Sequence, residues 1–302
     1  MSHEVTRISE GVYFLGTFGT PQVISSYLVR GQKIALIEPG PTCVQNDVMR
    51  SVVALGVNPS EVSYVVVSHI HIDHAGGAGS LMRRMPKAKV VAYEPGAKHL
   101  VDPSRLIASA RLVLGDILDY WEEPEPISSE RVTGVKDGET LDLGGPSLRF
   151  IATPGHAPHE MAIIEEKSHG LFTGDTVGIY RAPGRILTPA SPPPSFDYPS
   201  AIASITRLIE ANPSVLMIPH YGYWRNPLEL LQLNLRVYDG WAKSLERVAA
   251  QGGGLEEAVA RLLEVYPEYQ GLMRDPYAAN MFRMDAAGFL GHYTKRAAPP
   301  KS

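Results

Sequence analysis

Four side chains of the kinds that bind metal ions fall within six residues of the sequence: His69, His71, Asp73 and His74. They follow the run 64–67, a tyrosine and three β-branched valines, which predicts a strand buried on both faces. Residues two apart in an extended chain project to the same side, so His69 and His71 can converge on one point. Asp73 and His74 come where the chain should turn into a helix, and they can aim at a second point nearby. A core of satisfied histidines is the weaker alternative, because crowded imidazoles repel when protonated and need partners when neutral.

The order of these four residues, H-x-H-x-D-H, resembles the metal-binding motif of the metallo-β-lactamase superfamily. Members of that family have three further ligands, a His, an Asp and a His, each at the end of a strand. The sequence supplies a match for each in the same order, after short apolar runs: His156, Asp175 and His220. The ordered set of seven is specific, whereas any one of the later three would be weak evidence. The resemblance covers roughly residues 10–225, and its glyoxalase II and lactonase-like branch is the nearest by motif.

This resemblance implies an α/β fold, the αββα four-layer sandwich, with helices outside two sheets and the metals along one edge between them. We take residues 1–225 as a metallo-β-lactamase-like domain and residues 226–302, where only helical patterns occur, as a helical C-terminal extension. The apolar spacing over 104–121 predicts a helical stretch, which we take as a peripheral element. The proline-rich segment 180–198 has no periodicity, and it is either a wall of the substrate pocket or a surface connection.

The resemblance also implies which ligands share an ion. The first ion would be held by His69, His71 and His156, the second by Asp73, His74 and His220, with Asp175 bridging the two. A mixed imidazole and carboxylate set suits zinc, and the absence of a cysteine ligand makes iron or manganese compatible as well. Two divalent ions can share a hydroxide because each lowers the pKa of bound water toward about 7. Asp73 is the candidate to orient that hydroxide and to carry a proton.

Other polar residues near these ligands in the sequence have roles that the pattern alone leaves open. Tyr180 and Tyr221 are candidate catalytic residues, since a phenol can donate to a developing oxyanion, as in some lactonases of the superfamily. His159, three residues after His156, is either a hydrogen-bond partner of the ligands or a structural residue. Glu38 stands where the family usually has an aspartate, which predicts support of the metal loop from behind.

Composition and charge limit the cellular location and the kinds of partner that we expect for this protein. The 302 residues are 44% hydrophobic and 20% charged, which is ordinary for a soluble globular protein. A net charge of −4 gives no electrostatic footprint for nucleic acid or an anionic membrane. The single cysteine, Cys43, suits a reducing compartment. The polar N-terminus, residues 1–6, lacks a signal pattern, and no apolar run is long enough for a membrane span. We therefore expect a cytoplasmic protein, with a homodimer as the default oligomer.

The resemblance implies a hydrolase that uses a metal-bridging hydroxide on small-molecule ester-type bonds: a lactone, carboxylic ester, thioester or phosphotriester. Broad specificity would be typical of this resemblance. Three alternatives stay open. A mono-iron persulfide dioxygenase also resembles the motif, and one iron per chain with oxygen consumption would distinguish it. A nuclease of the tRNA-processing branch is disfavoured by the acidic charge balance. A non-catalytic module that keeps the fold is disfavoured by the complete set of ligands.

Overall fold

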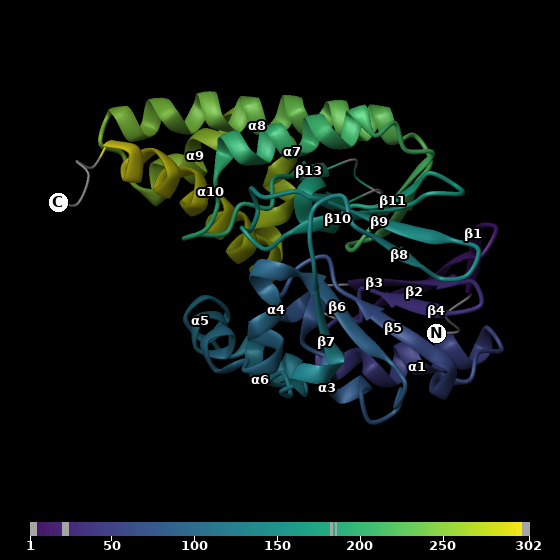
Figure 1. Ribbon diagram of the computed structural model, residues 1–302. Helices are drawn as coiled ribbons and strands as arrows, with labels where there is room; N and C mark the ends of the chain where they lie inside the picture. Colours follow the sequence, from purple (N-terminus) through teal and green to yellow (C-terminus); the bar gives the residue numbers. More distant parts are fainter. Residues whose placement is uncertain (1–4, 20–23, 182–183, 185, 298–302) are drawn as a thin grey trace. The chain divides into compact units, whose positions relative to one another are not determined.

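The computed structural model describes residues 5–19, 24–181, 184 and 186–297, the last four of these by their backbone alone (Figure 1). The chain ends, 1–4 and 298–302, lie outside this description, as do residues 182, 183 and 185 of the proline-rich segment. No helix in the described part is both long and apolar enough to span a bilayer.

The chain forms two compact units. The first unit contains the described residues up to 152 together with 159–174 and 213–226. The second contains 153–158, the described part of 175–212, and the described residues from 227 onward. These units are groups of residues that contact one another, and they do not show which parts of the chain fold independently. The predicted division into a domain of residues 1–225 and an extension of residues 226–302 therefore stays a prediction.

Two mixed β-sheets make up the centre of the first unit (Figure 1). The first sheet has seven strands in chain order, antiparallel from β1 to β4 and parallel from β4 to β7. Its strands are β1 Thr6–Ser9, β2 Val12–Phe18, β3 Ile24–Arg30, β4 Ile34–Ile37, β5 Val62–Val66, β6 Lys89–Tyr93 and β7 Val132–Val135. β4 follows β3 by way of Gly31, Gln32 and Lys33, as the hairpin pattern of the sequence indicates.

The second sheet has six strands in the order β15-β14-β11-β10-β9-β8. All neighbours are antiparallel except β11 and β14. The strands are β8 Thr140–Asp142, β9 Ser147–Ala152, β10 Met161–Glu165, β11 Gly170–Phe172, β14 Val215–Ile218 and β15 Gly222–Trp224. The three later candidate ligands follow the ends of these strands in the chain: His156 comes after β9, Asp175 after β11 and His220 after β14.

The strand before the metal motif, β5, is buried on both faces, as its β-branched sequence predicts. Val65 belongs to a core that includes residues of the helices, and Val66 belongs to a second core, shared with Phe150 and Ile163 of the second sheet. Successive side chains of a strand point to opposite faces, which places these two neighbours in different cores. The second core therefore joins the two sheets face to face.

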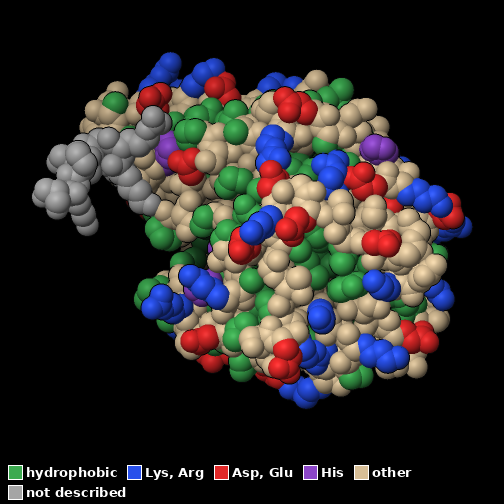
Figure 2. Space-filling view, viewed as in Figure 1, with side chains coloured by type: hydrophobic (Ala, Val, Ile, Leu, Met, Phe, Trp, Pro, Cys, Tyr) green, Lys and Arg blue, Asp and Glu red, His purple; other side chains and the backbone are tan. Residues whose placement is uncertain are grey.

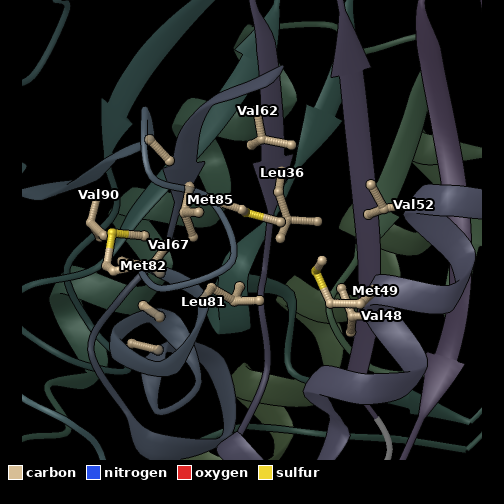
Figure 3. Close-up of a cluster of buried hydrophobic side chains, with 14 of the residues drawn as sticks. Leu36, Val48, Met49, Val52, Val62, Val67, Leu81, Met82, Met85 and Val90 are labelled. Carbon is tan, nitrogen blue, oxygen red and sulfur yellow. The ribbon is translucent and has the colours of Figure 1, made fainter. Parts of the chain in front are cut away.

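Helix α1 (Gln45–Ala54) covers the outer face of the first sheet. Figure 3 shows Val48, Met49 and Val52 of α1 directed toward Leu36 of β4 and Val62 of β5. Burial of each such side chain contributes about 1.5–3 kcal/mol. The other helices of this unit are α2 Ile72–Ala75, α3 Ala78–Leu81, α4 Glu94–Val101, α5 Ser104–Leu114 and α6 Ile117–Trp121, with short 3-10 turns η1 Thr42–Val44, η2 Pro59–Glu61 and η3 Ser129–Arg131.

The helical stretch predicted over 104–121 is confirmed, and the structure divides it into two helices, α5 and α6. Gly115 between them has a positive φ of 54°, which glycine adopts without the Cβ penalty of other residues. The apolar periodicity on either side of Gly115 is helical, so the pattern did not reveal the break.

The second unit is built of helices and one small hairpin (Figure 1). Its helices are α7 Tyr198–Glu210, α8 Pro227–Ala250, α9 Leu255–Val265 and α10 Pro276–Ala297, with the 3-10 helix η6 Pro267–Arg274. Strands β12 (Ile179–Arg181) and β13 (Ile186–Thr188) pair antiparallel within the proline-rich segment. Trp241 of α8 packs against Tyr269 of η6 and Phe282 and Phe289 of α10, which gives this unit an aromatic core.

Candidate metal centre

The motif after β5 changes from strand to helix within a few residues. His71 has an extended backbone, with φ −60° and ψ 148°, and α2 begins at the next residue, Ile72. The predicted turn into a helix is therefore confirmed. The extended part brings His69 Nε2 within 3.0 Å of His71 Nδ1. Two donors 3.0 Å apart and about 2.1 Å from one ion would subtend roughly 90° at it, so this spacing is compatible with a shared ion but tighter than tetrahedral spacing.

Three donors converge in the first unit from two distant parts of the chain. Asp73 and His74 are carried by α2, and His220 follows β14. Asp73 Oδ2 lies 3.4 Å from His74 Nε2 and 3.7 Å from His220 Nε2. Donors of a tetrahedral zinc site, with bonds of about 2.0–2.2 Å, lie roughly 3.3–3.6 Å apart. The spacing of these side chains therefore fits one divalent ion, and the three residues form one group of candidate metal donors.

The carboxylate of Glu38 supports His74 from the side away from these donors. Glu38 Oε2 is 3.2 Å from His74 Nδ1, and both side chains are buried. A ligand imidazole that donates its other nitrogen to a carboxylate is fixed in tautomer and orientation and becomes a better donor. Glu38 has a positive φ of 55°, a rare conformation for a residue other than glycine. The place of this glutamate behind the metal loop agrees with the sequence analysis.

We expect Glu38→Gln to weaken metal binding by roughly 10–100-fold, because the neutral amide removes the charge that strengthens His74 as a donor. Competition with a chromophoric chelator measures the affinity. Glu61→Gln, an exposed glutamate in η2, is the matched control and should bind metal as the wild type does. An unchanged affinity of the Glu38→Gln protein would show that this carboxylate does not support the ligand.

The second unit holds the two remaining candidate ligands. His156 Nε2 and Asp175 Oδ2 are 3.6 Å apart, and both side chains are about 95% buried. His156 Nδ1 donates to the carbonyl of Ala190 at 3.0 Å, which leaves Nε2 as the nitrogen with a lone pair for a metal. Asp175 lies in the 3-10 helix η4 (Gly174–Val177), directly after Gly174 in the chain.

Gly174 itself belongs to the first unit and is packed without room for a side chain. A Cβ on Gly174 would lie 2.7 Å from Glu160 Oε1 and 3.0 Å from Ser68 Cβ. Ser68 immediately precedes His69, and its hydroxyl is 3.0 Å from His69 Nδ1. The residue that begins η4 is thus fixed next to the start of the metal motif.

The two tyrosines proposed as catalytic residues lie in different units. Tyr180 is on β12 and is buried, whereas Tyr221 directly follows His220, has a positive φ of 68° and is 40% exposed. Their roles as oxyanion donors stay a prediction.

Two further polar residues, His159 and Glu160, lie near the motif, and the sequence did not define their contacts. The ring of His159 is nearly parallel to that of His69, with centroids 6.2 Å apart, and perpendicular to that of His71, at 5.5 Å. Glu160, which the sequence analysis did not select, is a fully buried carboxylate next to it. The only sequence feature that could have pointed to Glu160 is its position directly after His159.

Comparisons with known proteins identify the family of this chain. The model of the metallo-beta-lactamase superfamily matches residues 19–220, and the chain belongs to that superfamily. The metallo-beta-lactamase fold-containing protein ST1585 of Sulfurisphaera tokodaii is 32% identical over 206 residues, which cover 67% of this chain and 74% of that protein. The coenzyme F420H(2) oxidase of Methanothermobacter marburgensis is 27% identical over 290 residues, which cover 82% of this chain and 64% of the oxidase.

Solved structures share the fold. The metallo-beta-lactamase family protein TTHA1429 of Thermus thermophilus superposes with a TM-score of 0.71 at 19% identity, covering 97% of this chain and 96% of that one. The ST1585 structure gives a TM-score of 0.65 at 23% identity, covering 94% and 98%. The chain therefore has the metallo-β-lactamase fold, two mixed sheets flanked by helices, with a C-terminal helical region α8–α10. The glyoxalase II and lactonase-like branch stays a prediction.

The family and the clustered donors together define a metal-binding protein. The buried His and Asp side chains are consistent with a binuclear metal site. The donor types do not select one metal, since zinc, iron and manganese all accept imidazole and carboxylate ligands.

Proposed function

We propose that this protein is a hydrolase with two divalent metal ions that cleaves ester-type bonds of small molecules: lactones, carboxylic esters, thioesters or phosphotriesters. The observation that carries the proposal is the spacing of Asp73, His74 and His220, which fits a single ion. A zinc ion of a catalytic site takes three protein ligands and keeps one open position. Seven donors therefore suit two ions.

The bound ions would supply an ionised water near neutral pH and a positive charge opposite the developing oxyanion. The chain's own residues would then orient and transfer protons. The Asp73 carboxylate would accept a hydrogen bond from the attacking water and carry its proton to the leaving group. Glu38 would keep His74 in the tautomer that leaves Nε2 available. A phenol, Tyr180 or Tyr221, would donate to the substrate oxygen that gains charge.

A small-molecule substrate is favoured over nucleic acid by the charge distribution. The net charge is −4, and Figure 2 shows acidic and basic side chains interspersed over the face in view, without a continuous basic surface. A nucleic-acid site needs clustered Lys and Arg side chains. Homodimer formation and a cytoplasmic location stay predictions.

Redox chemistry is the second candidate. A relative that matches 82% of this chain is named an oxidase, and the donor set of histidines and carboxylates also suits iron. The dioxygenase alternative of the sequence analysis belongs to the same class. Iron-loaded protein that consumes oxygen in the presence of a reduced substrate would favour it.

The test is a substrate screen with protein loaded separately with zinc, manganese and iron(II). We expect hydrolysis of at least one of the four ester classes, lost on chelation and restored when the metal is returned. Protein with a full metal complement that hydrolyses none of them, and that consumes oxygen when iron-loaded, would contradict the hydrolase and support the oxidase.

A further inference from the structure

The Ala190–Ser191 peptide group joins a candidate metal ligand to a buried carboxyl group within the second unit. Its carbonyl accepts the hydrogen bond from His156 Nδ1 at 3.0 Å. Its N–H donates to Asp285 Oδ1 of α10 at 2.8 Å. The carbonyl and the N–H belong to the same peptide plane, so the ligand and the carboxyl group are two hydrogen bonds apart, although 129 residues (285 − 156) separate them in the sequence.

Several contacts hold this peptide group in place. Ser191 Oγ donates to the Asp285 carbonyl at 3.0 Å, and the N–H of Ala190 donates to Tyr238 Oη of α8 at 3.1 Å. A Cβ at Gly288, one turn after Asp285, would lie only 1.6 Å from the Ser191 carbonyl oxygen. Only a residue without a side chain fits there, which shows how closely α10 approaches this segment.

Helix α8 contacts the loop of the other ligand as well. Asn234 lies one turn before Tyr238 on the same helix face, and its Nδ2 donates to the carbonyl of Val177. Val177 is the last residue of η4, which carries Asp175. Both Asn234 and Tyr238 are buried. The two ligands of this unit are therefore each backed by a polar side chain of α8, which bonds to the backbone of the segment next to the ligand.

We propose that Asp285 is a positioning residue of the metal centre, which holds and polarises His156 through the Ala190–Ser191 peptide group, and that Tyr238 fixes the same peptide. This inference rests on the metal centre of the proposed function. Hydrogen bonds in a chain polarise one another, so a carboxyl oxygen on the N–H makes the carbonyl a stronger acceptor for His156 Nδ1. His156 would gain through a peptide the fixed orientation and tautomer that His74 gains directly from Glu38.

The hydrogen bond from Ser191 does not depend on the charge of Asp285. Burial raises the pKa of this carboxyl to about 8, and the charge of Asp175 acts in the same direction, while the Ser191 N–H and Arg181 oppose it. An oxygen of the carboxyl group accepts the N–H in either protonation state. An amide oxygen can do the same, which makes Asp285→Asn a conservative variant.

The test compares zinc affinity among proteins that differ at single positions. Zinc(II) alone is the probe, titrated against a chromophoric chelator, and the absorption spectrum of the cobalt(II)-loaded protein reports the ligand field. We expect Asp285→Ala to bind zinc roughly 10-fold more weakly, the low end of the range for residues that support a ligand. Asp285→Asn should stay within about 3-fold of the wild type, because the acceptor oxygen is kept.

Tyr238→Phe gives a second variant that keeps the proposal testable if the alanine variant does not fold. It removes the oxygen that accepts the Ala190 N–H, and we expect weaker zinc binding and an altered cobalt(II) spectrum. Tyr293→Phe is the matched control, since the Tyr293 hydroxyl also bonds to α8 but donates to the Ala242 carbonyl, one turn after Tyr238, and not to the Ala190–Ser191 segment. It should change neither readout.

Wild-type zinc affinity in Asp285→Ala and Tyr238→Phe would overturn the inference. So would an equal loss in Tyr293→Phe, because that would indicate general loosening of the helices. The proposed function fails by a different result, namely wild-type protein that binds zinc and hydrolyses none of the ester classes, so the two failures are distinguishable.

Discussion

Replacing Asp73 with alanine is expected to lower kcat for ester hydrolysis by roughly 10²–10⁴-fold, the range for loss of a general acid–base group. Asp73 is the only carboxylate among the candidate ligands of the first unit, and its Oδ2 lies 3.4 Å from His74 Nε2 and 3.7 Å from His220 Nε2. The substitution removes both a metal donor and the group proposed to carry the proton. Initial rates on the substrate found in the screen, with metal content measured on the same protein, check both effects.

The matched control is Asp116→Ala, an exposed aspartate before α6. It should keep the kcat and metal content of the wild type. An Asp73→Ala protein with full activity and two ions per chain would contradict the role of Asp73. Loss of the metal with an unchanged kcat would contradict the metal-dependent mechanism itself, because the proposed nucleophile is a water ionised by the bound ions.

Chelation of the metal is expected to lower the melting temperature by about 8–16 °C. An ion that binds only the folded chain, at a free concentration of about 1,000 Kd, stabilises it by about 4 kcal/mol. A change of about 1 kcal/mol corresponds to about 2–4 °C for a chain of this size class. Because His69, His74 and His220 are at most 1% exposed, the donors that an ion would tie together lie within the folded core. Thermal unfolding with and without chelator, followed by return of the metal, measures the effect.

His74→Ala provides the internal control for this experiment. This variant lacks a donor of the Asp73, His74 and His220 group, so chelator should shift its melting temperature by less than that of the wild type. Equal melting temperatures of wild-type protein at every metal concentration would mean that the folded chain does not bind the ion preferentially.

The local part of the metal centre could be predicted from the sequence because its donors are close together in the chain. The period-two spacing of His69 and His71 and the turn into α2 follow from the backbone preferences of a strand end, and the structure has both. The support of His74 by Glu38 was expected from the family pattern, and the two groups are 3.2 Å apart.

The hydrogen bonds that the C-terminal helices make to the segments next to the candidate ligands could not be predicted from the sequence. Asp285 is an ordinary aspartate in a helical pattern, and only the tertiary structure brings it to the Ser191 N–H. The described part of the proline-rich segment lacked periodicity because short strands and hydrogen bonds to side chains of α8 and α10 order it, not a repeating apolar face. The break between α5 and α6 at Gly115 could not be predicted for a similar reason, since the apolar spacing on both sides of it stays helical.

The metal content per chain of purified protein, determined by elemental mass spectrometry, tests the central claim most directly. Two ions per chain, with zinc, manganese or iron in any proportion, are the expected result. One iron per chain that does not increase when metal is added, or no bound metal after reconstitution, would contradict the binuclear hydrolase.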